Sequence, residues 1–278
     1  MAPADQVDRY AVVGNPVAHS LSPRIHASFA AQTAQKISYE AIEIPVDSFA
    51  NGIRDLQQKG FSGVNVTVPF KREAWELCDH LSTRAQDAGA VNTLSFLADG
   101  SVAGDNTDGV GLTRDLVDNL GVTIEGQKIL LLGAGGAVRG VLGPILALSP
   151  DRLTIANRTP QKAVTLAQDF EKLGEIRALA YESLGSASYD LIINATAAGL
   201  SNQVPPIADS VLSENSVCYD MMYNISRATA FVDWAHARGV KQAFDGRGML
   251  VEQAAAAFHA WRGIYPRTAE VIKSLGQS

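Results

Sequence analysis

A buried strand that runs directly into a glycine-rich turn restricts the fold of this chain more than any other feature. Residues 128–132 are Lys-Ile-Leu-Leu-Leu, an apolar run typical of parallel strands that are covered on both faces. Residues 133–137, Gly-Ala-Gly-Gly-Ala, follow at once, and a helical run extends to Leu148. Backbone N–H groups at such a turn can bind a pyrophosphate at the positive end of the helix. The pattern predicts a Rossmann-type domain.

The match between this turn and the dinucleotide-binding fingerprint is partial. Gly133 and Gly135 fit the first two glycine positions, but Val138 stands where a third glycine is expected. A glycine-rich turn that only lets a helix pack closely on a strand is therefore an alternative interpretation.

The residues after the next predicted strand, 153–156, favour a phosphorylated cofactor. Asn157, Arg158 and Thr159 follow that strand, and Lys162 comes one helical turn later. NAD-binding chains usually place Asp or Glu here for the ribose hydroxyls. A guanidinium instead suits the 2′-phosphate of NADP, through two charge-assisted hydrogen bonds. A surface arginine without a ligand is the alternative, but the position of Arg158 after the glycine turn predicts NADP.

The rest of the chain also alternates strands with helices, which predicts an α/β fold with two domains. We expect an N-terminal α/β substrate domain of residues 1–107, completed by C-terminal helices in 249–278, and a Rossmann-type NADP-binding domain of residues 108–248. A deep cleft is expected between the two domains. Strands are predicted at 10–13, 42–44, 64–68, 91–96, 102–104, 191–194, 217–220 and 242–244, and a helix at 109–120.

The segment from Asn65 to Lys71 places a cation in an unusual position. Valines at 64, 66 and 68 alternate with Asn65 and Thr67, so a strand here would have one apolar and one polar face. Pro69 ends the strand, and Lys71 lies in the first turn of the next helix. A cation opposes the helix dipole there, by up to ~1 kcal/mol. We infer that Lys71 has a function other than helix stability.

Asp108 is the carboxylate expected to lie near Lys71, because both residues follow the ends of predicted strands. Hydride transfer between an alcohol and a ketone needs one group that exchanges the hydroxyl proton and a second that orients it. Lys71 and Asp108 are therefore the candidate catalytic pair. The alternatives are a solvated lysine on a helix surface, and an aspartate that caps the helix beginning at Gly109.

Polar residues suited to a polyhydroxy carboxylate are expected around this pair. Ser20 and Ser22 precede a helix N-terminus, where hydroxyl and N–H groups can receive a carboxylate, although Ser22 can equally be the cap of that helix. Asn92 begins a predicted strand. Gln253 lies on an alanine-rich helix, where a buried structural amide is the alternative.

The composition argues against several other classes of protein. Hydrophobic residues make up 46% of the 278 residues and charged residues 19%, as in soluble globular proteins. A net charge of −6 gives no broad basic surface for nucleic acid. Residues 1–9 lack the apolar core of a signal peptide, and no apolar run approaches the ~20 residues that span a membrane. Cys78 and Cys218 suggest neither a disulfide framework nor a metal site, so a cytoplasmic location is expected.

Nine segments together carry a specific resemblance. They are residues 14–23, 65–71, 89–93, 104–111, 133–137, 157–159, 194–196, 220–223 and 245–249. In this order they resemble the motifs of the shikimate dehydrogenase family, and the likeness runs over nearly the whole chain.

The resemblance implies NADPH-dependent reduction of 3-dehydroshikimate to shikimate, a step in chorismate and aromatic amino-acid biosynthesis. It implies that Lys71 is the acid–base residue and Asp108 its catalytic neighbour. The implied substrate-binding residues are Ser20, Ser22, Asn65, Thr67, Asn92, Tyr223 and Gln253. The implied NADP-binding residues are Gly133, Ala134, Gly135, Gly136, Ala137, Asn157, Arg158, Thr159, Lys162, Met221 and Gly246.

Two other functions are compatible with these residues. One is a quinate/shikimate dehydrogenase that uses NAD or both cofactors, and the other is a non-catalytic NADP-binding sensor on the same fold. We expect a small-molecule substrate, no nucleic-acid or membrane partner, no metal, and a monomer or homodimer.

Overall fold

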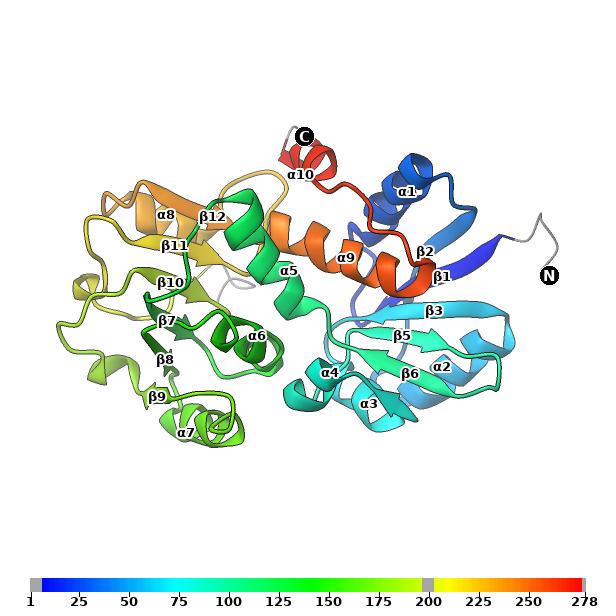
Figure 1. Cartoon of the computed structure of the whole chain (residues 1–278), viewed down its shortest axis with the longest axis horizontal. Helices are drawn as coiled ribbons and strands as arrows, with labels where there is room; N and C mark the ends of the chain where they lie inside the picture. Colours follow the sequence, from blue (N-terminus) through cyan, green and yellow to red (C-terminus); the bar gives the residue numbers. More distant parts are fainter. Residues whose placement is uncertain (1–6, 197–202, 277–278) are drawn as a thin grey trace. The chain divides into compact units, whose positions relative to one another are not determined.

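The computed structural model of the chain describes residues 7–196 and 203–276 and divides into two compact units. Unit 1 comprises Met1–Asp108 and Val251–Val271, and unit 2 comprises Gly109–Leu250 and Ile272–Ser278. The structure thus places residues 272–276 in unit 2, whereas the sequence predicts that 249–278 completes the first domain. Each unit contains a six-stranded sheet with helices packed against it, as expected of an α/β fold (Figure 1).

Unit 1 contains a mixed sheet with the order β2-β1-β3-β5-β6-β4. β1 pairs in parallel with β2 and β3, whereas β5 pairs antiparallel with β3 and with β6. The strands predicted at 91–96 and 102–104 form a hairpin, the β5–β6 pair, and Gly100 supplies the positive φ (+87°) that its turn requires. The strands are β1 (Asp8–Gly14), β2 (Ile37–Glu43), β3 (Phe61–Val66), β4 (His80–Leu81), β5 (Thr93–Phe96) and β6 (Val102–Asp105).

The helices of unit 1 pack their apolar faces against this sheet. Phe49, Ile53 and Leu56 repeat on one face of α2 and lie in the core with Val13 and Val64. The helical elements of this part of the chain are α1 (Ser22–Thr33), η1 (Val46–Ser48), α2 (Phe49–Gln58), α3 (Lys71–Leu77), α4 (Thr83–Ala88) and α9 (Arg247–Arg262), which begins within the range of unit 2.

Unit 2 contains a fully parallel sheet with the order β12-β11-β10-β7-β8-β9 (Figure 1). This is the doubly wound Rossmann order, and the predicted apolar strand is β7, at the centre. Its residues from Ile129 to Leu132 are completely buried, because both faces of the sheet are covered. The strands are β7 (Lys128–Leu132), β8 (Arg152–Ala156), β9 (Ile176–Leu179), β10 (Leu191–Asn194), β11 (Val217–Asp220) and β12 (Gln242–Asp245).

The helix predicted at 109–120 differs from the structure. α5 ends at Arg114, and a π-helical turn over Asp115–Asn119 follows. The side chain of Asp115 is buried in unit 2, where its carboxylate accepts hydrogen bonds from the Tyr219 hydroxyl (2.7 Å) and the Asn119 amide (3.0 Å). The wider turn accompanies this buried carboxylate, a feature that helical periodicity cannot predict.

The remaining helical elements lie within the range of unit 2, except that α5 and α10 begin within the range of unit 1. They are α5 (Asp108–Arg114), η2 (Asp115–Asn119), α6 (Gly136–Leu146), α7 (Pro160–Asp169), η3 (Tyr181–Ser183), η5 (Asp209–Val211), α8 (Ala230–His236) and α10 (Ala269–Gly276). Within the described ranges, we find no helix that combines the length and the apolar character needed to cross a membrane.

Candidate active site

The structure brings the predicted lysine and aspartate into direct contact in unit 1. Lys71 is the first residue of α3 and Asp108 the first residue of α5. The Lys71 Nζ donates to Asp108 Oδ2 at 2.5 Å. The two side chains are 22% and 10% exposed, so the pair is largely shielded but still reachable. Lys71 is therefore not a solvated lysine on a helix surface.

The second carboxylate oxygen of Asp108 also has a side-chain partner. Asp108 Oδ1 accepts a hydrogen bond from Asn92 Nδ2 at 2.8 Å. In the described part of the chain, neither oxygen accepts an N–H group of α5, so the helix-cap interpretation of Asp108 is wrong. The carboxylate is held by two residues from other elements, which fixes its orientation toward Lys71.

Asn92 is the centre of this hydrogen-bond network. Its side chain is buried, and its Oδ1 accepts from the Thr107 amide (2.9 Å) and the Thr93 hydroxyl (2.9 Å). These contacts determine which end of the amide is the donor, so the Nδ2 points to Asp108. Gln253, on α9, lies at the edge of the network, with its Oε1 3.4 Å from both Asn92 Nδ2 and Thr107 Oγ1.

Asn65, near the end of β3, extends the network toward the edge of the sheet. Its Nδ2 donates to the Asn92 carbonyl (3.1 Å) and the Thr93 hydroxyl (3.0 Å), and its Oδ1 accepts from the Tyr39 hydroxyl (2.7 Å). Thr67 lies just past β3, which ends at Val66 rather than at residue 68 as predicted.

Ser20 and Ser22 lie together at the start of α1. Ser20 Oγ accepts from the Ser22 amide and donates to Ser22 Oγ, both at 3.2 Å. The N-cap of α1 is Leu21, so the interpretation of Ser22 as the cap is wrong. Ser22 is buried as the first residue of a 12-residue helix, at the positive end of its dipole.

Two residues of this region were not identified from the sequence. Burial raises the pKa of Tyr39 well above its ordinary value, against the opposing effect of a hydrogen bond with Ser22, so Tyr39 stays a neutral donor to Asn65. His26 stacks on the Tyr39 ring, with 4.1 Å between the centroids. Only their spacing in the sequence could have identified them. His26 comes one helical turn after Ser22, and Tyr39 lies on the same face of β2 as Ala41.

The glycine turn of unit 2 has the properties expected of a pyrophosphate site. Gly133 follows β7 with φ +113°, a conformation that side chains rarely adopt. A Cβ at Gly135 or Gly136 would meet nothing within 4 Å, so the backbone there is open to a ligand. Gly135 is the N-cap of α6, an 11-residue helix whose positive end faces this opening. Ala137 is in its first turn.

The residues after β8 adjoin this turn. Gly133 N donates to the Ala156 carbonyl at 2.8 Å, which ties the glycine turn to the end of β8. Asn157 Nδ2 donates to the Thr159 carbonyl at 2.9 Å and so shapes the loop. Arg158 and Lys162 are exposed, and neither pairs with a carboxylate among residues 7–196 and 203–276. The Arg158 and Lys162 side chains are therefore accessible at the position where a 2′-phosphate is expected.

A cavity of about 240 Å³ lies beside these residues. Four of its lining residues are not among the residues predicted from the sequence, and one of the four, Arg139, is charged and pairs with Asp169 at 2.6 Å. Arg139 lies one turn after Gly136 on α6, and that spacing is the signal that could have identified it. The lining residues are Ala134, Arg139, Gln161, Lys162, Thr165 and Leu166.

The last predicted residues of unit 2 follow β11 and β12. Asp220 Oδ1 accepts from Asn194 Nδ2 (3.0 Å) and from the amide of Met222 (3.1 Å), which fixes the turn that carries Met221 and Tyr223. A Cβ at Gly246 would lie 2.4 Å from the Met221 carbonyl oxygen, so the close approach of the two loops requires glycine.

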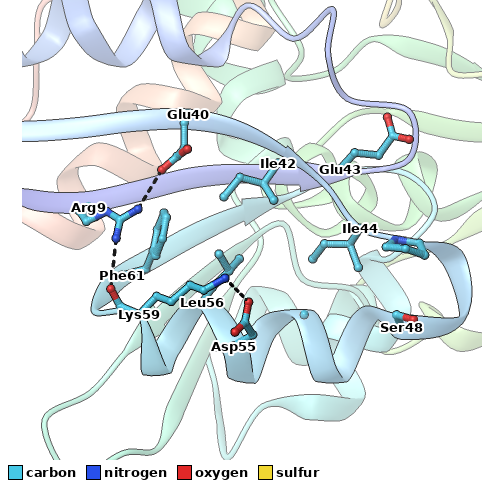
Figure 2. Close-up of a pocket in the computed structure, with 12 residues that line it drawn as sticks. Arg9, Glu40, Ile42, Glu43, Ile44, Ser48, Asp55, Leu56, Lys59 and Phe61 are labelled. Carbon is cyan, nitrogen blue, oxygen red and sulfur yellow. Dashed lines mark hydrogen bonds and ion pairs between the residues drawn. The ribbon is translucent and has the colours of Figure 1, made fainter.

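A second cavity, in unit 1, lies apart from the predicted residues (Figure 2). It measures about 430 Å³ and lies between β2 and α2. Arg9 pairs with Glu40 at 3.2 Å and Lys59 with Asp55 at 2.7 Å, so most of its charges are already neutralised. None of its lining residues belongs to the network around Lys71.

Family models match three segments of the chain. The model described as the shikimate dehydrogenase substrate binding domain matches residues 12–94. The model described as shikimate/quinate 5-dehydrogenase matches residues 115–246, and the model described as the shikimate 5′-dehydrogenase C-terminal domain matches residues 246–275.

Whole proteins match over nearly the full length. The chain is 54% identical to the shikimate dehydrogenase (NADP(+)) of Thioalkalivibrio sulfidiphilus over 97% of this chain and 98% of that protein. It is 52% identical to the enzyme of the same name from Methylococcus capsulatus, over 97% and 96%. The solved structure of shikimate 5-dehydrogenase from Thermus thermophilus, in complex with NADP(H) and shikimate, is 33% identical, with a TM-score of 0.86 and coverage of 97% and 98%.

Proposed function

This chain belongs to the shikimate dehydrogenase family, and from this membership we infer that it interconverts 3-dehydroshikimate and shikimate with NADP as its cofactor. It is an oxidoreductase that acts on a CH–OH group, in the route to aromatic amino acids. We further propose that unit 1 binds the substrate and unit 2 the cofactor. The enzyme is proposed to act in the cytoplasm, as a monomer or homodimer, on small molecules alone.

The contact between Lys71 and Asp108 is the observation that carries the proposed mechanism. An ammonium group has three N–H donors, and Asp108 occupies one of those on Lys71, which leaves donors for a substrate oxygen. NADPH, when bound, supplies the hydride to the ketone carbon. Lys71 transfers a proton to the ketone oxygen as that oxygen gains charge, and takes it back in the oxidation direction. Asp108 orients the ammonium throughout.

The residues around the pair are proposed to bind the substrate. The Ser20 and Ser22 hydroxyls, at the positive end of α1, suit its carboxylate. Asn65, Thr67, Asn92 and Gln253 supply amide and hydroxyl groups for its ring hydroxyls, and Tyr223 is proposed to contribute from unit 2. Asn65 and Asn92 are held by neighbouring side chains, so they would need little reordering when the substrate binds.

The residues of the glycine turn fit NADP. Three features suit the phosphate groups of NADP. They are the open backbone at Gly135 and Gly136, the N-terminus of α6, and the exposed cations Arg158 and Lys162. Met221 and Gly246 are proposed to contact the nicotinamide end. The named relatives are NADP(+) enzymes, so the NAD-dependent quinate/shikimate dehydrogenase is not the favoured interpretation, and neither is a non-catalytic sensor.

The reaction itself is tested by the absorbance of NADPH formed from NADP and shikimate. We expect turnover with this pair to exceed turnover with quinate or with NAD. Equal rates with NAD would contradict the proposed cofactor preference, and no NADPH formation would contradict the proposed reaction.

We expect the change Arg158→Gln to raise the KM for NADP by about 10-fold to 100-fold, the value of one charge-assisted hydrogen bond. The KM for NAD, which lacks the 2′-phosphate, should change little. Steady-state rates with both cofactors measure this. Arg152→Gln, at the other end of β8, is the matched control and should leave both values unchanged. Equal rises in both KM values would show that Arg158 does not bind the 2′-phosphate.

A further inference from the structure

We propose that Arg84 is a positioning residue for the reaction: it anchors the end of β6 and thereby holds Asp108 against Lys71. This inference rests on the proposed catalytic roles of Lys71 and Asp108. Arg84 itself lies on α4 and is assigned no contact with substrate or cofactor. All the residues concerned belong to unit 1.

Arg84 binds the last residue of β6 through two hydrogen bonds. Its Nε donates to Asp105 Oδ1 at 2.6 Å and its Nη2 donates to Asp105 Oδ2, a two-pronged contact that fixes the plane of the carboxylate. The Ser82 hydroxyl adds a third donor, at 2.6 Å from Asp105 Oδ1. Burial raises the pKa of Asp105, but the hydrogen bonds from Arg84 and Ser82 outweigh it and hold the pKa below its usual value. Asp105 is therefore ionised and firmly held.

The Asp105 carboxylate in turn orients the short segment that leads from Asp105 to Asp108. Asp105 Oδ1 accepts the Asn106 amide at 2.8 Å. The Asn106 side chain then bonds at both ends: its Oδ1 accepts the Asp108 amide (3.1 Å) and its Nδ2 donates to the Ala90 carbonyl (3.0 Å). A continuous series of hydrogen bonds thus joins Arg84 to the backbone of Asp108, whose carboxylate contacts Lys71.

The same anchor also reaches Asn92. The Asn92 amide donates to the Asp105 carbonyl at 3.0 Å, and the Asn92 side chain donates to Asp108 Oδ1 at 2.8 Å. Asp105 therefore positions Asp108 in two ways, through Asn106 in the same segment and through Asn92. A displacement of about 1 Å at a catalytic group can cost on the order of 100-fold in rate, so a loosened segment should lower turnover.

The test compares Arg84→Gln with wild type, in the full-length enzyme and in an Asp108→Asn background. We expect Arg84→Gln to lower kcat with saturating shikimate and NADP by about 10-fold to 100-fold, and to leave the KM for NADP unchanged. In the Asp108→Asn background it should lower kcat less than about twofold further, because two residues that act through one group are not additive. Arg84→Lys keeps the charge but not the two-pronged contact, and should give an intermediate kcat.

Arg72→Gln is the matched control, because Arg72 is exposed on α3 next to Lys71 and, among the residues that the structure describes, forms an ion pair only with Glu76 of its own helix. It should leave kcat unchanged. A kcat for Arg84→Gln within twofold of wild type, whatever its melting temperature, would overturn the inference, and so would an equal loss in both backgrounds. Failure of the proposed function would give a different result, because the Asp108→Asn variant alone would then keep near-normal turnover.

Discussion

Replacement of Lys71 by alanine should lower kcat by about 10²-fold to 10⁴-fold, the usual contribution of a positioned acid–base residue. Alanine cannot exchange a proton, and it leaves Asp108 Oδ2 without the donor that contacts it at 2.5 Å. The KM for NADP should stay close to the wild-type value, because the proposed cofactor residues lie in unit 2. Initial rates of NADPH formation with saturating shikimate measure the effect.

Lys59→Ala is a suitable control for this change. Lys59 also belongs to unit 1 and also pairs with an aspartate, Asp55, at 2.7 Å, but both side chains are more than half exposed. An exposed pair of this kind contributes little to stability, so the variant should keep both its fold and its turnover. Near-normal turnover of Lys71→Ala, with unchanged cofactor binding, would remove Lys71 from the mechanism.

The architecture of unit 2 could be predicted well from its residues. A buried strand that enters a glycine turn has few structural solutions, so β7, its helix and the parallel order around it followed from local sequence. The irregular turn after α5 could not be predicted in this way. Asp115 is held by Tyr219, more than one hundred residues later in the chain, and such a long-range partner leaves no trace in helical periodicity.

The candidate site was predictable only where its residues follow the ends of strands. Lys71 and Asp108 were paired on that basis, and the structure places them in contact. The orientation of Asn92 was not predictable, because it depends on hydrogen bonds with Thr93, Thr107 and Asp108, and folding brings the last two of these to Asn92. The anchor of Asp105 by Arg84 was missed for the same reason: their contact joins α4 to β6, and neither residue has a distinctive local pattern.

His26 should make the free energy of unfolding fall as the pH falls. Burial lowers the pKa of His26 from 6.5 to about 3 in the folded protein. The unfolded chain therefore binds a proton that the folded protein does not, between about pH 6.5 and about pH 3, and this contribution to stability is fully present only above that window. At pH 4.5 the loss relative to pH 7 should be about 2 to 3 kcal/mol from this residue alone.

Chemical denaturation of wild type and His26→Phe at both pH values measures this contribution. Phenylalanine keeps an aromatic ring against Tyr39 but does not titrate, and neither His26 ring nitrogen has a hydrogen-bond partner in the described residues that the change would remove. Carboxylates such as Asp105 titrate in both proteins, so the difference between the two isolates His26. His80→Gln, at an exposed histidine of β4, should behave like wild type. If His26→Phe lost as much stability as wild type between pH 7 and pH 4.5, His26 would not be buried in its neutral form.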